Sequence, residues 1–458
     1  MTSARRNLRR RERAPAVALA TAKARTAAAP RSRARYLRPT VANRVLWLLC
    51  LMYFIYYIDR VNVSTAAPLL QRDLGLSHEQ LGIAFGAFAL PYTIFQLIGG
   101  WLGDRFGPRR TLGIGGLVVC AATILTGAVS GFLSLRLVRL LLGIGEGAAF
   151  PTATRAMAAW LPEADWGYAQ GITHSLARVG NALTPGIVFA LISLISWRGS
   201  FVVVGLASLA WVLVWLWFFR DDPRRHPALA AEERASLPPP RPAAPALPRR
   251  ERWRQWGRLA GRILPVTAVD FCYGWTLWLF LNWIPSFFYG SFHQKLGEAA
   301  LLSTAVFFAG VIGDTAGGVI SDRILARTGD LRRARCSVIA AGLFGAAVFL
   351  IPVVLVHDLA VVTVSLALCF FCAELVVGPI WSVPMDIAPR HAGSASGMMN
   401  LGFGIAGMIS PWFFGYMIDR TGSWAWPFGA SLALLFLGAA LALFLRPDRP
   451  FEAAVERA

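Results

Sequence analysis

Residues 99–110 read GGWLGDRFGPRR, and residues 317–323 read GGVISDR. Both stretches contain the pattern GGxxxDR, and each directly follows a long apolar segment. The same motif at equivalent places in two parts of one chain indicates an internal duplication. Parallel repeats of this kind are typical of membrane transporters built from two similar halves. We therefore expect an all-α membrane protein made of two helical bundles.

The composition agrees with this expectation. Of the 458 residues, 56% are hydrophobic and only 15% are charged, whereas soluble proteins carry about 25% charged residues. A helix needs about 20 apolar residues to cross the hydrocarbon core. On that basis the sequence predicts twelve transmembrane helices, at 45–70, 81–102, 111–130, 133–155, 168–192, 199–219, 263–288, 299–320, 336–356, 359–385, 395–418 and 424–445.

Hydrophilic stretches set the expected domain boundaries. The predicted units are a basic, disordered tail at 1–44, a six-helix bundle at 45–219, a linker at 220–262, a second six-helix bundle at 263–446 and a short tail at 447–458. The linker contains a Pro-rich stretch at 236–249, which should be extended. The first tail lacks the apolar core and cleavage site of a secretory signal.

The basic residues predict the orientation of the chain. The formal net charge is +20, and most Lys and Arg lie in the first tail, in the linker and in the loops after the second and eighth spans. The positive-inside rule then places both termini and the linker in the cytoplasm. This distribution argues against a nucleic-acid binder. The Arg-, Ala- and Gly-rich composition suggests a bacterial chain, and hence the inner membrane.

The cysteines do not predict a metal or redox centre. Five of the six lie within apolar segments, and Cys336 begins one. Cys369 and Cys372 form a CxxC, but no second ligand pair lies nearby, so small packing residues are the favoured interpretation. We expect no cofactor and no metal.

Charged residues inside the apolar segments predict a polar route through the protein. A charge at the centre of a bilayer costs roughly 3 kcal/mol on insertion scales, so it normally faces a protein interior or a water-filled path. The first span contains the adjacent pair Asp59 and Arg60. Further spans contain Arg139, Glu146, His174, Arg178, Asp270, Asp314 and Glu374.

With the repeated motif, the chain resembles the major facilitator superfamily. A narrower resemblance, to its anion:cation symporter family, rests on YYIDRVNVSTAAP (56–68), AFALPYTIFQLIGGWLGDRFG (87–107), RLLLGIGEGAAFP (139–151), FCYGWTLWLFLNWIP (271–285) and SGMMNLGFGIAGMISP (396–411). The resemblance implies the major facilitator fold. It also implies transport of small organic anions such as hexuronates, galactonate, glucarate or tartrate, commonly with protons.

The resemblance also implies a binding site. Arg60 is the candidate carboxylate ligand, because a planar guanidinium grips a carboxylate in a bidentate way. Glu146 and Asp59 are the candidate proton carriers. Arg139 lies seven residues before Glu146, hence on the same helix face. The alternatives are a structural ion pair of Asp59 and Arg60, and a permanent Arg139–Glu146 clamp between helices.

Other candidate substrate contacts are spread over four spans. Tyr92, Tyr273, Asn282 and Asn400 match or adjoin substrate-facing positions of the family, although core packing is the alternative for each aromatic residue alone. Trp275 and Trp278 replace residues that are often Tyr, which argues against a sugar acid. His174 and Arg178 lie four residues apart on one helix face. They could contact a second anionic group of the substrate, or form a local polar network.

The GGxxxDR motifs are expected to form a gate rather than a substrate site. Asp104 should meet a helix N-terminus across the interface between the halves, and the arginines should meet carboxylates or lipid. The predicted gating residues are Gly100, Asp104, Arg105, Gly107, Arg109, Asp322 and Arg323.

The sequence therefore predicts a secondary transporter, since it has no ATP-binding GxxxxGK[ST] loop. The first hypothesis is proton-coupled symport of a small organic anion by a monomer in the lipid bilayer. An organic-anion exchanger or exporter is the alternative within transport. A membrane enzyme or a sensor is the alternative of another class. No nucleophile–base pair supports an enzyme, and no signalling domain supports a sensor.

Overall fold

A computed structural model describes residues 40–162, 166–237, 249–388 and 392–451, and the regular structure of these ranges is entirely helical. The first half contains α2 (Val41–Thr65), α3 (Ala67–Leu74), α4 (His78–Phe106), α5 (Pro108–Thr126), α6 (Phe132–Gly147), α7 (Ala149–Trp160), α8 (Trp166–Leu194) and α9 (Trp197–Phe218). After η3 (Pro223–Arg225) and α10 (Ala231–Ser236), the second half contains α11 (Arg249–Ser291), α12 (Leu296–Thr328), α13 (Leu331–Leu355), α14 (Leu359–Glu374), α15 (Val377–Ile387), α16 (Ala392–Thr421) and α17 (Ala425–Ala442).

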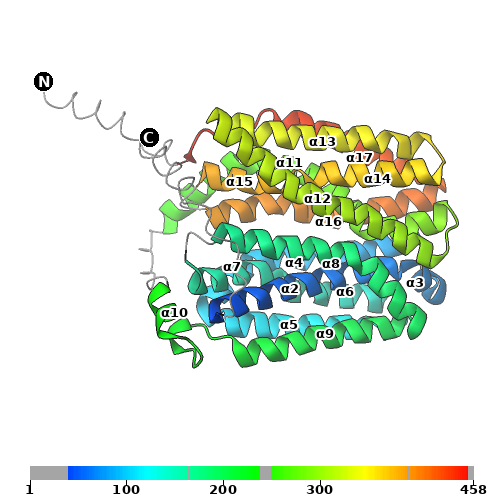
Figure 1. The fold of residues 1–458 in the computed structure, drawn as a ribbon. Helices are drawn as coiled ribbons and strands as arrows, with labels where there is room; N and C mark the ends of the chain where they lie inside the picture. The colour runs from blue at the N-terminus through cyan, green and yellow to red at the C-terminus, as the bar shows by residue number, and fades with distance from the viewer. Residues whose placement is uncertain (1–39, 163–165, 238–248, 389–391, 452–458) are drawn as a thin grey trace, which may run out of the picture.

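The helices form two layers that repeat one packing pattern (Figure 1). In the first half α2 packs on α8, α4 on α6 and α5 on α9. In the second half the corresponding pairs are α11 on α16, α12 on α14 and α13 on α17. The expected internal duplication is therefore present in three dimensions. The halves meet where α4 contacts α16, α8 contacts α12 and α2 contacts α11.

Ten of the described helical segments are long and apolar enough to cross a membrane. The two remaining spans are α4 and the consecutive pair α6 and α7, which lie among them in the first layer (Figure 1). The predicted fold class, twelve transmembrane helices in two six-helix bundles, is confirmed.

The fourth span of each half is broken at the same place. The sequence predicts continuous helices at 133–155 and 359–385, but α6 gives way to α7 after Gly147, and α14 gives way to α15 after Glu374. Pro151 and Pro379 each occupy the third residue of the second piece. Because proline has no N–H to bond the carbonyl four residues earlier, each proline weakens the helix where the break occurs.

The segment between the halves is partly helical. α11 is 43 residues long and begins at Arg249, well before the expected span at 263. A hydrogen bond from the Val41 N–H to Glu233 Oε2 (3.2 Å) joins α10 to the start of α2. α2 begins at Val41, so the last four residues of the predicted disordered tail (1–44) are helical. The rest of that tail up to residue 39, and residues 238–248 of the Pro-rich stretch 236–249, lie outside the described residues. The ends of that stretch, Ser236 and Arg249, belong to α10 and α11.

The two ends of the bundle differ. We call the end that carries α10 the linker end and the end that carries α3 the far end (Figure 1). At the far end Trp197 Nε1 on α9 donates to Asp73 Oδ2 on α3 (2.8 Å). This bond, with one from Arg72, holds the pKa of the Asp73 carboxyl below its usual value.

The far end is closed by a tight contact between the halves. The N–H groups of His78 and Glu79 at the start of α4 donate to Asp419 of α16 (3.1 and 2.6 Å). A carboxylate at a helix N-terminus is favourable because it meets the positive end of the helix dipole. Gly415 of α16 lies against the backbone of His78, so that a Cβ there would overlap the His78 carbonyl oxygen.

Candidate functional site

Arg60 lies at the centre of a buried cluster of the first half. Its Nε donates to Glu146 Oε2 at 2.6 Å, joining α2 to α6, and both side chains are almost fully buried. Four aromatic rings surround the guanidinium, which places it within cation–π distance of each. The distances from the guanidinium carbon to the ring centres are 4.9 Å for Tyr57, 5.3 Å for Phe88, 4.5 Å for Tyr92 and 5.2 Å for Phe150. We call these six residues the Arg60 cluster.

The ion pair in this cluster is incomplete. Arg60 Nη2 and Glu146 Oε1 are both buried and have no hydrogen-bond partner among the described residues. An arginine usually meets a carboxylate through two parallel hydrogen bonds, but only one joins this pair. Because a buried donor without a partner costs about 1–3 kcal/mol or more, Arg60 retains a strong tendency to bind another anion.

Asp59 points away from this cluster. It accepts hydrogen bonds from Thr123 Oγ1 on α5 (2.9 Å) and from Ser208 Oγ on α9 (3.1 Å). Adjacent residues of a helix point about 100° apart, so Asp59 and Arg60 serve different neighbours. The structure contains no ion pair between them.

Arg139 is buried and forms no ion pair with Glu146, which counts against the alternative of a permanent Arg139–Glu146 clamp. Its guanidinium carbon lies 5.0 Å from the centre of the Phe88 ring. Its Nε has no hydrogen-bond partner among the described residues. Glu146 pairs with Arg60 instead, a contact between two spans that helix spacing could not predict.

A second buried cluster lies between the halves. Arg178 of α8 reaches two carboxylates of the second half: its Nε lies 3.1 Å from Glu374 Oε2 on α14 and 3.6 Å from Asp314 Oδ2 on α12. Tyr273 of α11 donates from its hydroxyl to Glu374 Oε1 (3.3 Å). We call these four residues the Arg178 cluster. The two acids, which the sequence left without a role, are the partners of Arg178.

The two clusters share one neighbour. The ring of Tyr57 lies 4.9 Å from the guanidinium carbon of Arg60 and 5.9 Å from that of Arg178. The two guanidinium carbons can therefore be no farther apart than these two distances combined. Sequence reasoning missed Tyr57, because an aromatic residue in an apolar span carries no signal of its own.

The remaining candidate ligands have mixed positions. The His174 ring lies near the rings of Tyr53 and Trp381, with centroid distances of 5.4 and 6.2 Å. Asn400 donates to Gln96 Oε1 across the halves (2.7 Å). Asn282 donates to the carbonyl of Trp278 one turn earlier on α11 (2.7 Å), so its hydrogen bond is local to that helix.

The first GGxxxDR motif contacts the end of α9. Gly107 has a positive φ of 82°, and a side chain there would collide with Asp221. The Arg109 N–H donates to Asp221 Oδ1 (2.8 Å), and its side chain donates to the Leu216 carbonyl. Arg105 is exposed beside Trp101 (5.4 Å), and Gly100 lies near Pro151. The side chain of Asp104 lies outside the described residues.

The second motif forms a different contact. Asp322 accepts from Arg335 Nη1 on α13 (3.0 Å), and Arg335 Nε also reaches Asp386 Oδ2 on α15 (3.2 Å). Arg323 is exposed. Arg335 was not among the residues singled out from the sequence, because this pairing depends on three separate helices.

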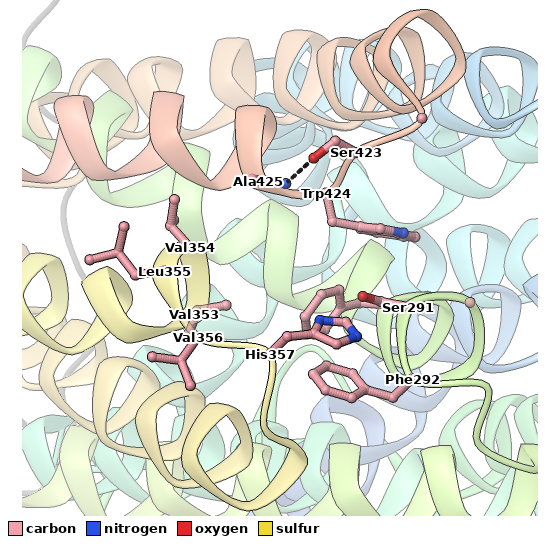
Figure 2. A pocket seen from close by; sticks show the side chains of 13 residues that line it. Ser291, Phe292, Val353, Val354, Leu355, Val356, His357, Ser423, Trp424 and Ala425 are labelled. Carbon is pink, nitrogen blue, oxygen red and sulfur yellow. Dashed lines mark hydrogen bonds between the residues drawn. The ribbon is translucent and has the colours of Figure 1, made fainter.

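A separate cavity of about 390 Å³ opens at the far end of the second half. Figure 2 shows His357, Phe292 and Trp424 gathered at this cavity, and the rings of His357 and Phe292 stack at 4.7 Å. Its lining contains no Arg, Lys, Asp or Glu. It is therefore distinct from both arginine clusters and offers no strong partner for an anion.

Comparison with known proteins settles the family. The profile of the Major Facilitator Superfamily matches residues 49–411. The chain belongs to this superfamily. A bacterial homologue of the human lysosomal transporter Spinster, in an inward-facing and unoccupied conformation, shares the fold with a TM-score of 0.72 and 19% identity, over 90% of this chain and 99% of the other. A D-xylose–proton symporter superposes with a TM-score of 0.69 at 15% identity, covering 88% and 97%.

Two named relatives narrow the resemblance within this superfamily. A probable sulfoacetate transporter of Cupriavidus necator is 47% identical over 90% of this chain and 97% of the relative. A hexuronate transporter of Bacillus subtilis is 30% identical over 88% and 94%. The expected resemblance to transporters of the anion:cation symporter type is confirmed. These relatives are transporters, as expected for a chain that is not an enzyme.

Proposed function

We propose that this protein is a proton-coupled symporter of a small organic anion. The observation that carries the proposal is the half-satisfied Arg60: a buried guanidinium with one hydrogen bond to Glu146 and a second nitrogen without a partner. A carboxylate or sulfonate is the group that such a nitrogen binds best. The similarity to a probable sulfoacetate transporter along nearly the whole chain supports a short acid of this kind.

Glu146 is the proposed proton carrier. When a substrate anion binds Arg60, it competes with the Glu146 carboxylate for one cation. Two anions at one buried cation are unfavourable, so Glu146 takes up a proton as the substrate binds. When the substrate leaves, Glu146 loses the proton and pairs with Arg60 again. Asp59, held by two hydroxyl donors, assists as a second acid in the same half.

The aromatic rings and the other polar candidates complete the proposed site. Tyr92 and its neighbours exclude water around Arg60 and so strengthen its attraction for an anion. Asn400, Arg139, Asn282, Tyr273, His174 and Arg178 line the route at further positions. The residues of the GGxxxDR motifs form the gate.

The proposed setting is a bacterial inner membrane, with the protein as a monomer. In this setting the linker end and both termini are cytoplasmic, and the far end is periplasmic. The transporting halves are 45–219 and 263–446, joined through 220–262, with tails at 1–44 and 447–458. Alternating access follows from rocking of one half against the other.

The test is uptake of radiolabelled sulfoacetate into proteoliposomes under an inward proton gradient, with Arg60→Lys as the variant. Lysine keeps the charge but loses the planar fork and the ring stacking. We expect substrate affinity to fall at least about thirtyfold, which corresponds to about 2 kcal/mol.

Arg198→Lys is the matched control. Arg198 belongs to the same half, stacks on Trp197 at 4.1 Å and donates to two backbone carbonyls at the end of α5. It lies outside both clusters, so its replacement should leave affinity within about twofold of wild type. An Arg60→Lys variant with wild-type affinity would remove Arg60 from the site.

A further inference from the structure

The second half contains a structural copy of the Glu146 position. Glu146 begins the sequence EGAAFP, and Glu374 begins ELVVGP. Glu146 is the last residue but one of α6, and Glu374 is the last residue of α14, so each glutamate lies at the break in its span. A proline follows each glutamate five residues later. Both glutamates are fully buried. Glu374 therefore occupies in α14 the place that Glu146 occupies in α6.

The charges around Glu374 are not balanced. Arg178 faces it from α8, Asp314 from α12 and Tyr273 from α11, while Tyr57 of α2 covers the guanidinium. Two carboxylates thus share one guanidinium in a buried site. Arg178 Nη1 is itself buried without a hydrogen-bond partner among the described residues. The cluster can accept either a further anion at Arg178 or a proton on one acid.

We propose that Glu374, together with Asp314, is a second proton-loading site, and that it is loaded when the second anionic group of a dianionic substrate takes Arg178 from these two acids. This inference rests on the proposed function, in which Arg60 binds the first anionic group. It deepens that function by naming the substrate class as a compact organic dianion.

The position of Tyr57 makes the two-point grip possible. Both guanidinium carbons lie within cation–π distance of its ring. An acid whose two charged groups are separated by one or two carbon atoms can therefore face both cations at once. Within this cluster the Asp314 side chain keeps 15% of its surface exposed, whereas Arg178 keeps 8% and Glu374 none.

The proton balance is simple. When the Glu374–Asp314 pair loses Arg178 to the substrate, one of its two carboxylates binds one proton from solution and becomes a neutral acid, while no covalent bond forms or breaks in the substrate. When the substrate departs, the acid releases its proton and pairs with Arg178 again. A dianion that engages both arginines thus brings one proton to Glu146 and one to the Glu374–Asp314 pair.

The experiment measures protons taken up per substrate bound, by calorimetry of the purified full-length protein in buffers of different ionisation enthalpy. Sulfoacetate is the dianion, and acetate is the monoanion that reaches only Arg60. In Glu374→Gln, proton uptake with sulfoacetate should fall by about one, and sulfoacetate should bind about tenfold more tightly, because a competing charge is gone. Proton uptake with acetate should not change.

Two further variants keep the test decisive. Asp314→Asn leaves the charge of Arg178 paired with Glu374, so this variant remains usable if Glu374→Gln fails to fold. It should also lower proton uptake with sulfoacetate. Asp270→Asn removes another buried carboxylate of the second half, outside the Arg178 cluster. It should match wild type in proton uptake.

The outcomes separate the two proposals. The second site is overturned if proton uptake with sulfoacetate is unchanged in both Glu374→Gln and Asp314→Asn. It is also overturned if both variants bind sulfoacetate more weakly than wild type. Neither outcome affects the proposed role of Arg60. If wild-type protein binds neither sulfoacetate nor acetate, the proposed function is wrong and the second site is overturned with it.

Discussion

Glu146→Gln is the most direct test of coupling. The Glu146 carboxylate and the Arg60 guanidinium are 2.6 Å apart and both buried. Removing one charge of such a pair typically costs about 3–5 kcal/mol. Glutamine keeps an oxygen that can accept the Arg60 hydrogen bond, so we expect the lower end of that range, about 3 kcal/mol, in the substrate-free protein. A bound anion supplies the missing charge, so substrate should stabilise the variant against heat more than it stabilises wild type.

The effect on transport follows from the number of coupled protons. With the membrane potential clamped at zero and a pH difference of one unit, each coupled proton supports about tenfold accumulation, since one pH unit corresponds to about 1.4 kcal/mol. Glu146→Gln cannot release a proton. We therefore expect its steady-state accumulation ratio in proteoliposomes to be about tenfold below that of wild type.

Counterflow provides the internal control. Exchange of labelled external substrate for unlabelled internal substrate needs no net proton movement. The variant should therefore retain counterflow in preloaded vesicles. If Glu146→Gln accumulates substrate to the wild-type ratio under the pH gradient, then Glu146 is a structural clamp, and the reasoning from the half-satisfied Arg60 is wrong.

Two further predictions concern neighbouring parts of the structure. Asp59→Asn should leave substrate affinity within about threefold of wild type, because Asp59 is bonded to hydroxyls of α5 and α9 and not to Arg60; a large loss of affinity in a binding titration would contradict the separation of the two residues. Gly415→Ala should lower the free energy of unfolding by about 1–3 kcal/mol, because its Cβ would overlap the backbone of His78. The purified variant should therefore melt at a lower temperature than wild type. Gly429→Ala, where a Cβ meets nothing within 4 Å, is the control and should melt as wild type does.

The sequence predicted the architecture well because the physics of a membrane span is local. Twenty apolar residues suffice to indicate a helix, and the duplicated motif at 99 and 317 suffices to indicate two related halves. The broken spans were missed although a local signal was present. Pro151 and Pro379 lie at equivalent positions after Glu146 and Glu374, and a proline inside a helix removes one backbone hydrogen bond.

The partners of the charged residues could not be predicted in the same way. A charged residue within an apolar span is visible in the sequence, so Arg60, Glu146 and Arg178 were identified as candidates from the sequence. Which acid meets which arginine depends on how the spans pack, and helix spacing only left an Arg139–Glu146 clamp open as an alternative. The carboxylate instead meets Arg60 from another helix. Of the four rings around Arg60, only Tyr92 was indicated, by the family resemblance; Tyr57, Phe88 and Phe150 carried no signal, since Phe and Tyr are ordinary core residues in such helices.

The placement of the two arginine–glutamate pairs has a mechanical consequence. Arg60 and Glu146 lie on α2 and α6 of one half, whereas Arg178 on α8 of the first half meets Glu374 and Asp314 of the second. In the proposed cycle, rocking of rigid halves would leave the first pair intact and would stretch the second, which joins the halves. The ion pairs of Arg178 therefore contribute to the attraction between the halves, whereas the ion pair of Arg60 lies within one half and does not. In the proposed cycle, a substrate group that replaces the two acids at Arg178 would remove this attraction between the halves, and binding at that point would thereby be linked to the conformational change.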